Sequence, residues 1–289
     1  MLIGQYAALL GLWIAAGSAP AGQGAEIDRA RQILKQHQDA VIWVSAVLKM
    51  SGFGGRTQEQ KAEAVGTVID PSGLTVVSLS MLDPMSLVMG LASSMGEGLD
   101  LNLKTQFSDV KMRLADETEI PATLVLKDPD LDLAFLLPEK KEGTALPKFT
   151  SIKLDGKPKA QVLDRIVMLN RCGKGLDRQP SVSLTRVSAV IRKPRTFYVV
   201  GASPMLGGGL GTPAFTVGGE VLGISLMRKG PRTGGMSSLF SGGMSAVILP
   251  AEDVREAAQQ ALKKKDQKAA KPKDDAPKKA EKKTEKEKP

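Results

Sequence analysis

Short runs of aliphatic and β-branched residues, separated by turn residues, recur along the middle of the chain. Examples are the runs at residues 41–44, 74–77 and 197–200. The intervals between runs contain turn sequences such as Pro-Ser-Gly at 71–73 and Val-Gly-Gly at 217–219. Strands at short spacing, bounded by turns, are typical of an all-β sandwich or barrel. The pattern therefore predicts an all-β core.

A helical period precedes the first of these runs. Ile27, Ala30, Ile33 and Leu34 recur among charged residues between positions 25 and 38, which predicts a short amphipathic helix. Before this segment, residues 6–16 form an apolar run too short to span a bilayer comfortably, and Ala-Pro-Ala at 19–21 resembles a cleavage site. We expect a signal peptide over residues 1–21 and an exported protein, periplasmic or extracellular. No Lys or Arg precedes the apolar run, so an uncleaved, membrane-attached N-terminus is the alternative.

The last 27 residues, 263–289, differ in composition from the rest of the chain. They hold 12 lysines and six acidic residues, a net +6 of the chain's +9. They lack aromatic and β-branched hydrophobic residues, so ordering them would bury too little apolar surface. We expect a disordered tail that either keeps the protein soluble or attaches it to an anionic envelope surface. Basic charge concentrated in a tail without aromatics argues against a nucleic-acid-binding face.

The composition of the remaining chain supports one packed unit. A chain of 289 residues with 42% hydrophobic residues can bury a sizeable core, but aromatics are only 4%, so the core must rely on aliphatic residues and Met. Cys172 is the only cysteine, which excludes an intramolecular disulfide. We interpret it as a small buried residue, with a reactive thiol as the alternative.

Three segments in order resemble trypsin-like serine proteases of the HtrA (DegP) type. Residues 64–82 are similar to the hairpin whose second strand ends at the catalytic histidine, and residues 127–136 to the segment that carries the aspartate. Residues 208–215, followed by Gly-Glu-Val-Leu-Gly-Ile at 219–224, are similar to the glycine-rich nucleophile loop and the next strand. The order and spacing of these segments are more specific than any one of them alone.

The resemblance implies the fold and its limits. It covers roughly residues 38–262 and implies two six-stranded antiparallel β-barrels with short terminal helices. The folded unit is expected at residues 25–262. Within it, the first barrel is expected at about 40–140 and the second at about 150–250. Residues 166–190 and 244–250 are similar to the family's entry into the second barrel and to its closing strand. No PDZ-like module is expected.

The resemblance also places the catalytic triad, and two of its three positions depart from the family. Asp132 matches the aspartate, Ser80 stands at the histidine position and Leu210 at the nucleophilic serine. His37, the only histidine, belongs to the N-terminal segment. Since the mechanism needs an imidazole to move the hydroxyl proton, proteolysis is not expected, and Asp132 would orient nothing. No metal or cofactor is implied.

The remnants of this site still suggest a function. Gly208, Gly209 and Gly211 would keep the bends of the oxyanion loop, and the family's cleft pairs a substrate strand through main-chain hydrogen bonds. We therefore expect a catalytically inactive homologue, a pseudoprotease, that binds an extended peptide or protein. The inserted segments at 81–103, which is Met-rich, and at 229–243 could close the cleft or present a new contact.

Two alternatives stay open from the sequence. One is an active serine-type peptidase in which Ser78, Ser80 or Cys172 works with an unrecognised base. The other is an envelope scaffold tethered by the Lys-rich tail, with the cleft filled by Leu210.

Overall fold

The computed structural model describes residues 21–51, 57–84, 104–141, 143–201, 209–229 and 244–270. The helical elements are α1 (Ala21–His37), η1 (Gln38–Ala40), α2 (Leu79–Leu82), η3 (Lys174–Leu176) and α5 (Ala251–Ala270). The strands are β1 (Val41–Ser51), β2 (Thr57–Val68), β3 (Thr75–Ser78), β4 (Lys104–Arg113), β5 (Glu119–Asp128), β6 (Leu133–Pro138), β7 (Arg165–Arg171), β8 (Pro180–Ile191), β9 (Phe197–Val200), β10 (Pro213–Thr216), β11 (Val221–Lys229) and β12 (Met244–Pro250).

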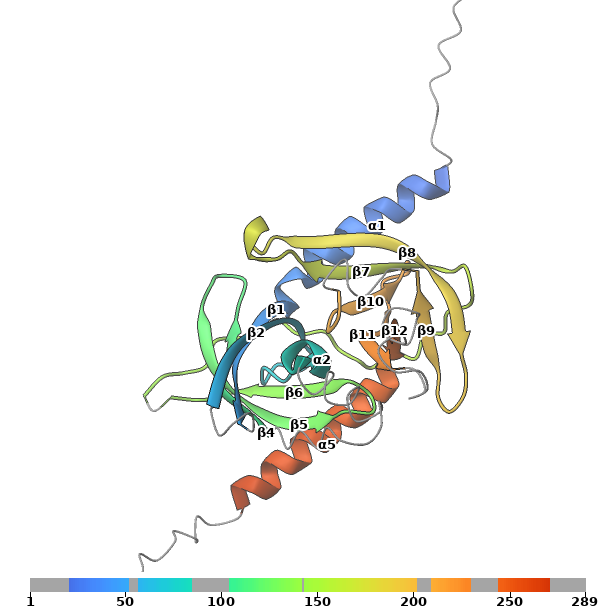
Figure 1. Cartoon of the computed structure of the whole chain (residues 1–289). Helices are drawn as coiled ribbons and strands as arrows, with labels where there is room; N and C mark the ends of the chain where they lie inside the picture. Colours follow the sequence, from blue (N-terminus) through green and yellow to red (C-terminus); the bar gives the residue numbers. More distant parts are fainter. Residues whose placement is uncertain are drawn as a thin grey trace, which may run out of the picture.

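The strands form two closed antiparallel barrels with the same topology (Figure 1). The first barrel runs β1-β2-β3-β6-β5-β4 and closes where β4 pairs with β1. The second runs β7-β8-β9-β12-β11-β10 and closes where β10 pairs with β7. The structure confirms the predicted fold class, two six-stranded antiparallel β-barrels with terminal helices.

Alternation of side chains explains how the strands enclose each barrel. In β1, Val44, Ala46 and Leu48 are buried, whereas Ser45 and Val47 between them are half-buried. Successive side chains of a strand point to opposite faces, so one set fills the barrel and the other covers its outside. β3 and the first five residues of β6 are buried throughout, because they lie on the side of the first barrel that faces the second.

One hydrophobic cluster joins the two barrels and the C-terminal helix. Phe135 of the first barrel, Leu226 and Leu249 of the second, and Val254 of α5 all belong to it and are almost fully buried. α5 contacts β5 as well as β11 and β12, so it lies across the junction of the barrels (Figure 1). Its apolar face is made mostly of alanines, which lets the helix approach the strands closely.

The N-terminal helix α1 packs on the second barrel. Ala30 and Ile33 are buried against it, as the amphipathic pattern predicted, while Ile27 remains exposed. Arg29 Nη2 donates to the Gly218 carbonyl at 2.7 Å. Glu26 of α1 also forms an ion pair with Arg165 of β7, so apolar packing and two polar contacts attach the helix to the barrel.

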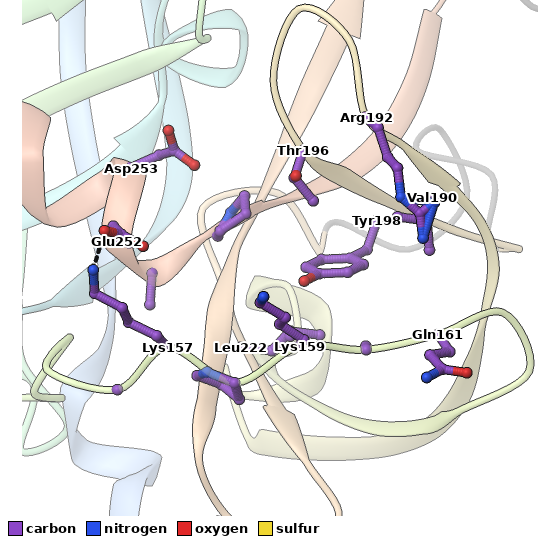
Figure 2. Close-up of a pocket in the computed structure, with 15 residues that line it drawn as sticks. Lys157, Lys159, Gln161, Val190, Arg192, Thr196, Tyr198, Leu222, Glu252 and Asp253 are labelled. Atoms are coloured by element: carbon purple, nitrogen blue, oxygen red, sulfur yellow. Dashed lines mark hydrogen bonds and ion pairs between the residues drawn. The ribbon is translucent and has the colours of Figure 1, made fainter.

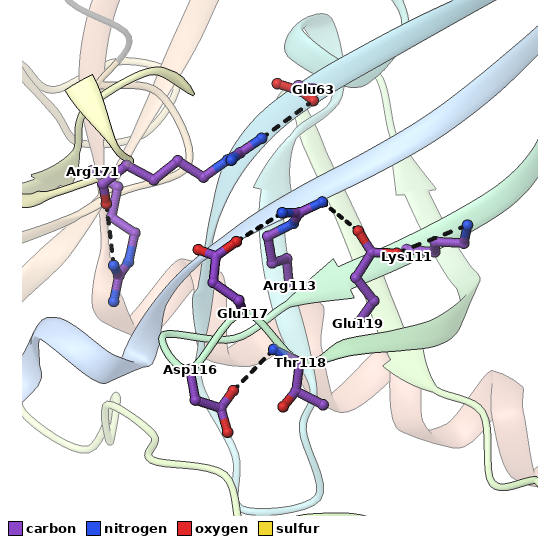
Figure 3. Close-up of polar contacts among 9 residues, drawn as sticks. Glu63, Lys111, Arg113, Asp116, Glu117, Thr118, Glu119 and Arg171 are labelled. Carbon is purple, nitrogen blue, oxygen red and sulfur yellow. Dashed lines mark hydrogen bonds and ion pairs between the residues drawn. The ribbon is translucent and has the colours of Figure 1, made fainter. Parts of the chain in front are cut away.

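Arginines of the second barrel reach the first (Figure 3). Arg171, at the end of β7, donates to the carbonyl oxygens of Gln38, at 3.0 Å, and of Val41. Arg178 lies 3.7 Å from the Glu63 carboxylate on β2. The Arg171 guanidinium is buried and satisfied by backbone oxygens, so it fixes the chain where β1 begins.

The C-terminal boundary differs from the one predicted. α5 continues to Ala270, so the first eight residues of the predicted tail, 263–270, are helical. Alanines, Gln and lysines are good helix formers and extend a helix that is already anchored by its buried face. The remaining predicted tail at 271–289, the predicted signal peptide up to residue 20, and most of the two inserted segments lie outside the described residues. Among the described helices, none combines the length and apolar character needed to span a bilayer.

Candidate functional site

Asp132 lies in the turn between β5 and β6, at the junction of the two barrels. Its backbone is left-handed, with φ of 60°, a conformation that Asp tolerates better than most residues. The residue is only 3% exposed. The acidic turn before it is held by Asp128, whose Oδ1 accepts from the Asp130 and Leu131 amides at 3.1 and 3.0 Å.

Three residues from both barrels hydrogen-bond the Asp132 carboxylate. Ser78 Oγ donates to Oδ2 at 2.5 Å and the Ser80 amide donates to Oδ1 at 2.7 Å, both from the first barrel. The Met227 amide of β11 donates to Oδ2 at 2.8 Å from the second barrel. The expectation that Asp132 orients nothing is therefore wrong, because its carboxylate bridges the two barrels.

Two opposing effects act on the pKa of Asp132. Burial disfavours the charged form and raises the pKa above its ordinary value of 3.8, while the hydrogen bonds from Ser78, Ser80 and Met227 lower it. Burial is the larger effect. A carboxylate in this position is costly unless its donors remain in place.

Ser80 lies in the short helix α2, directly after β3. Its backbone amide donates to Asp132 Oδ1 at 2.7 Å, and its side chain also hydrogen-bonds the Asp132 carboxylate. The residue is 7% exposed. The structure thus brings Ser80 and Asp132 together as the resemblance implied for the histidine and aspartate positions, through both the amide and the side chain of Ser80.

Leu210 is buried in the core of the second barrel. It is 2% exposed and belongs to a cluster with Val200, Ala214 and Leu222, against which Met81 of α2 also packs. An aliphatic side chain in this position offers neither a proton nor a lone pair. Leu210, which the resemblance places at the nucleophile position, therefore contributes packing in this structure.

The glycine-rich loop around Leu210 is fixed to the first barrel. Gly211 has a φ of +81°, and its carbonyl accepts from Thr67 Oγ at 2.7 Å. A Cβ on Gly211 would lie 2.2 Å from the Val65 carbonyl oxygen, so only glycine fits. The Gly209 carbonyl accepts from Thr212 Oγ at 2.6 Å, and Gly208 lies outside the described residues.

The other candidate nucleophiles and bases lie elsewhere or are inaccessible. The His37 ring stacks on Phe215 with centroids 5.1 Å apart, and burial lowers its pKa below 6.5. Cys172 lies just beyond β7, where its amide pairs with Gln179. Ser78 does meet Asp132, but it is fully buried. Among the described residues, no group of three or more His, Cys, Asp or Glu side chains could hold a metal ion.

The edge of β11 beside Asp132 extends past its partner strand β10. β10 pairs with β11 only up to Ile224, and the Ser225 amide and carbonyl then bond to Thr212 and Gly211. The next outward amide, that of Met227, binds Asp132. Beyond it, within the described part of the chain, no strand pairs with this edge of β11 up to Lys229.

Sequence reasoning missed the roles of Ser78 and Met227 in this site. Ser78 was considered only as a possible nucleophile, although a serine two residues before the histidine position could have been recognised as a donor to the aspartate. Met227 acts through its amide, which every residue except proline carries, so no side-chain pattern could indicate it.

Comparison with known proteins agrees with this geometry. A family model described as a trypsin-like peptidase domain matches residues 65–224, more than half of the chain. That range includes the positions of Ser80, Asp132 and Leu210. No curated protein matches the chain.

Proposed function

Because this chain belongs to the trypsin-like peptidase domain family, we propose that it is a non-proteolytic member of HtrA (DegP) type that binds extended peptides. The observation that carries the proposal is the state of the triad positions. Leu210 is packed into the barrel core, and the Asp132 carboxylate is bound by Ser78, Ser80 and Met227. The site stabilises the junction of the barrels.

Proteolysis by this fold needs a nucleophile whose proton passes to a base. Leu210 cannot supply the proton, and Ser80 cannot act as an imidazole. Oxyanion loops without a working triad retain only about 10³–10⁴-fold acceleration over water, far below protease rates. The loss of catalysis therefore leaves the binding surface as the part of the site that can still act.

Strand addition is the binding mode that the geometry supports best. Beyond Met227, the edge of β11 that faces away from β12 continues the barrel sheet. The backbone amides of Ser225 and Met227 both point away from β12, and amide direction alternates from one residue to the next along a strand. The Lys229 amide therefore also points away from β12. An extended peptide that pairs here would gain main-chain hydrogen bonds without any catalytic residue.

Lys229→Pro tests this mode. It removes the outward amide and leaves the bonds to β12, whereas Lys229→Ala removes the side chain and keeps the amide. We expect the proline variant to bind fluorescent casein-derived peptides about tenfold more weakly in anisotropy titrations, while the alanine variant retains most of the affinity. Equal affinity in both variants would contradict strand addition at β11.

A rival reading is an active peptidase built on Ser78 and Asp132, favoured by their 2.5 Å contact. Full burial of Ser78 opposes it, because the hydroxyl cannot reach a peptide bond. Incubation with a fluorophosphonate and with casein separates the two: we expect neither labelling nor hydrolysis. Labelling that disappears in Ser78→Ala would establish the rival.

We also place the protein in the cell envelope, on the basis of the export pattern over residues 1–21. Sequencing the N-terminus of the protein recovered from the periplasm of an expressing bacterium should give a chain that begins after Ala21. The Lys-rich segment at 271–289 would then add loose attachment to anionic surfaces. Deleting it should abolish salt-sensitive retention on anionic vesicles and leave peptide binding unchanged.

A further inference from the structure

A cavity of about 680 Å³ lies on the second barrel (Figure 2). Its walls are the linker at residues 156–161, the hairpin of β8 and β9, and the start of α5. The volume is within the range of about 300–1,000 Å³ that is typical of small-molecule sites. None of its lining residues belongs to the site around Asp132.

The floor of this linker cavity is apolar and built into the barrel core. Ala160, Tyr198 and Leu222 line it and belong to a buried cluster. Tyr198 is only 3% exposed, so its ring is held in place. The apolar part of a ligand, flat or branched, can therefore contact this floor without rearrangement of the protein side chains.

Most charges at the rim neutralise one another. Lys157 forms an ion pair with Glu252, and Arg195 Nη1 lies 3.3 Å from the Asp253 carboxylate. These pairs close the side of the cavity formed by α5. Neither acidic group is left as an uncompensated charge facing the cavity.

Two cations at the rim have no such partner. Lys159 and Arg192 form no ion pair or hydrogen bond within the described part of the chain, and they flank Tyr198 in Figure 2. Glu252 interacts with Lys159 only at longer range. Thr196 also lines the cavity. Both cationic side chains are exposed and can therefore reach an anion held at the rim.

We propose that the linker cavity binds a small anionic ligand with an apolar body. Its carboxylate or phosphate group pairs with Lys159, Arg192 or both, and its apolar part contacts Ala160 and Leu222. The Arg192 guanidinium suits either group because it can donate two parallel hydrogen bonds. The Tyr198 and Thr196 hydroxyls add neutral donors that fix the orientation.

Titration of the full chain by amide NMR tests the proposal, with benzoate, phenyl phosphate, benzyl alcohol and inorganic phosphate as probes. We expect the amide chemical shifts of Ala160, Thr196 and Tyr198 to change and to reach saturation with at least one aromatic anion. The same anion should bind about tenfold or more tightly than benzyl alcohol and than inorganic phosphate. Comparing benzoate with phenyl phosphate decides which anionic group the site takes.

The double variant Lys159→Gln/Arg192→Gln should weaken that binding by about tenfold or more. The control Lys61→Gln/Lys140→Gln removes two exposed cations outside the cavity and should bind as the wild type does. All four positions are at the surface, and circular dichroism verifies that the variants fold. Equal weakening in both double variants, equal binding of benzyl alcohol, or no saturable shift with either aromatic anion would overturn the proposal.

Discussion

Asp132 has a left-handed backbone, is buried, and accepts hydrogen bonds from three residues. In an active relative a carboxylate at this position would serve an imidazole, whereas here it binds Ser78, Ser80 and Met227. In this structure Asp132 therefore has a structural role at the junction of the barrels. The consequence is that its loss should affect stability and leave hydrolysis unchanged.

Asp132→Asn is expected to destabilise the protein by about 2–4 kcal/mol, since an amide group has only one acceptor oxygen. If that oxygen accepts from Ser78 and Met227, the NH₂ group faces the buried Ser80 amide and leaves it unpaired. Asn also tolerates the left-handed backbone, so the variant isolates the loss of the carboxylate. Urea unfolding measures the effect. The control is Asp130→Asn, an exposed neighbour in the same turn, which should change stability by less than about 0.5 kcal/mol. Similar losses in both variants would refute the role assigned to Asp132.

His37 gives the chain a pH-dependent contact. Burial against Phe215 lowers the pKa of the ring below 6.5, so the unfolded chain binds a proton more readily than the folded one. Stability contributed by His37 is therefore present above the ordinary pKa and decreases as the pH falls through the folded pKa. Since the chain has one histidine, ring proton NMR reads its pKa directly.

We expect His37→Gln to flatten the rise of the unfolding free energy between about pH 5 and pH 7, and to cost about 0.5–1.5 kcal/mol at pH 7 through the lost stacking. Gln36→Ala, an exposed neighbour on α1, should keep the wild-type pH dependence. A His37 pKa at or above 6.5 would contradict the explanation.

At the scale of elements, the glycine loop of the second barrel packs closely against the first barrel. Gly211→Ala combines a positive φ with a Cβ 2.2 Å from the Val65 carbonyl oxygen. Gly143 also has a positive φ, 75°, but open space around it. We expect Gly143→Ala to cost about 1 kcal/mol from backbone strain alone and Gly211→Ala to cost at least about 2 kcal/mol more. Thermal unfolding measures both, and equal losses would show that the close approach to Val65 carries no cost.

Elements with a local signal were predictable from the sequence. The strand at β9 and the helix at α1 follow from apolar periodicity, and the positions of Ser80, Asp132 and Leu210 from the spacing of family-like motifs. What could not be predicted depends on contacts between distant segments. The bond from Met227 to Asp132 and the cavity flanked by Lys159 and Arg192 join residues that no local pattern relates. α5 exceeded its predicted end because lysine is polar and a good helix former at once.

At the scale of the whole molecule, the contacts between barrels favour a single cooperative unit. Asp132 binds Met227, Thr67 binds Gly211, and one hydrophobic cluster includes strands of both barrels and α5. Neither barrel buries its facing side when it stands alone. We therefore expect both barrels to unfold together.

Trp43 in β1 and Tyr198 in β9 are the only Trp and Tyr residues after position 13, so a chain starting at Gly22 has one such probe in each barrel. Trp fluorescence and ¹⁹F NMR of fluorotyrosine should give the same urea midpoint. Val254→Ala, which removes fully buried methyl groups of α5 from the shared cluster, should lower both midpoints equally, at a cost of about 1–3 kcal/mol. Gln259→Ala on the exposed face of α5 should lower neither. If the Trp43 and Tyr198 transitions separated, the barrels would fold independently, and the bridging carboxylate of Asp132 would no longer explain why this position keeps an aspartate.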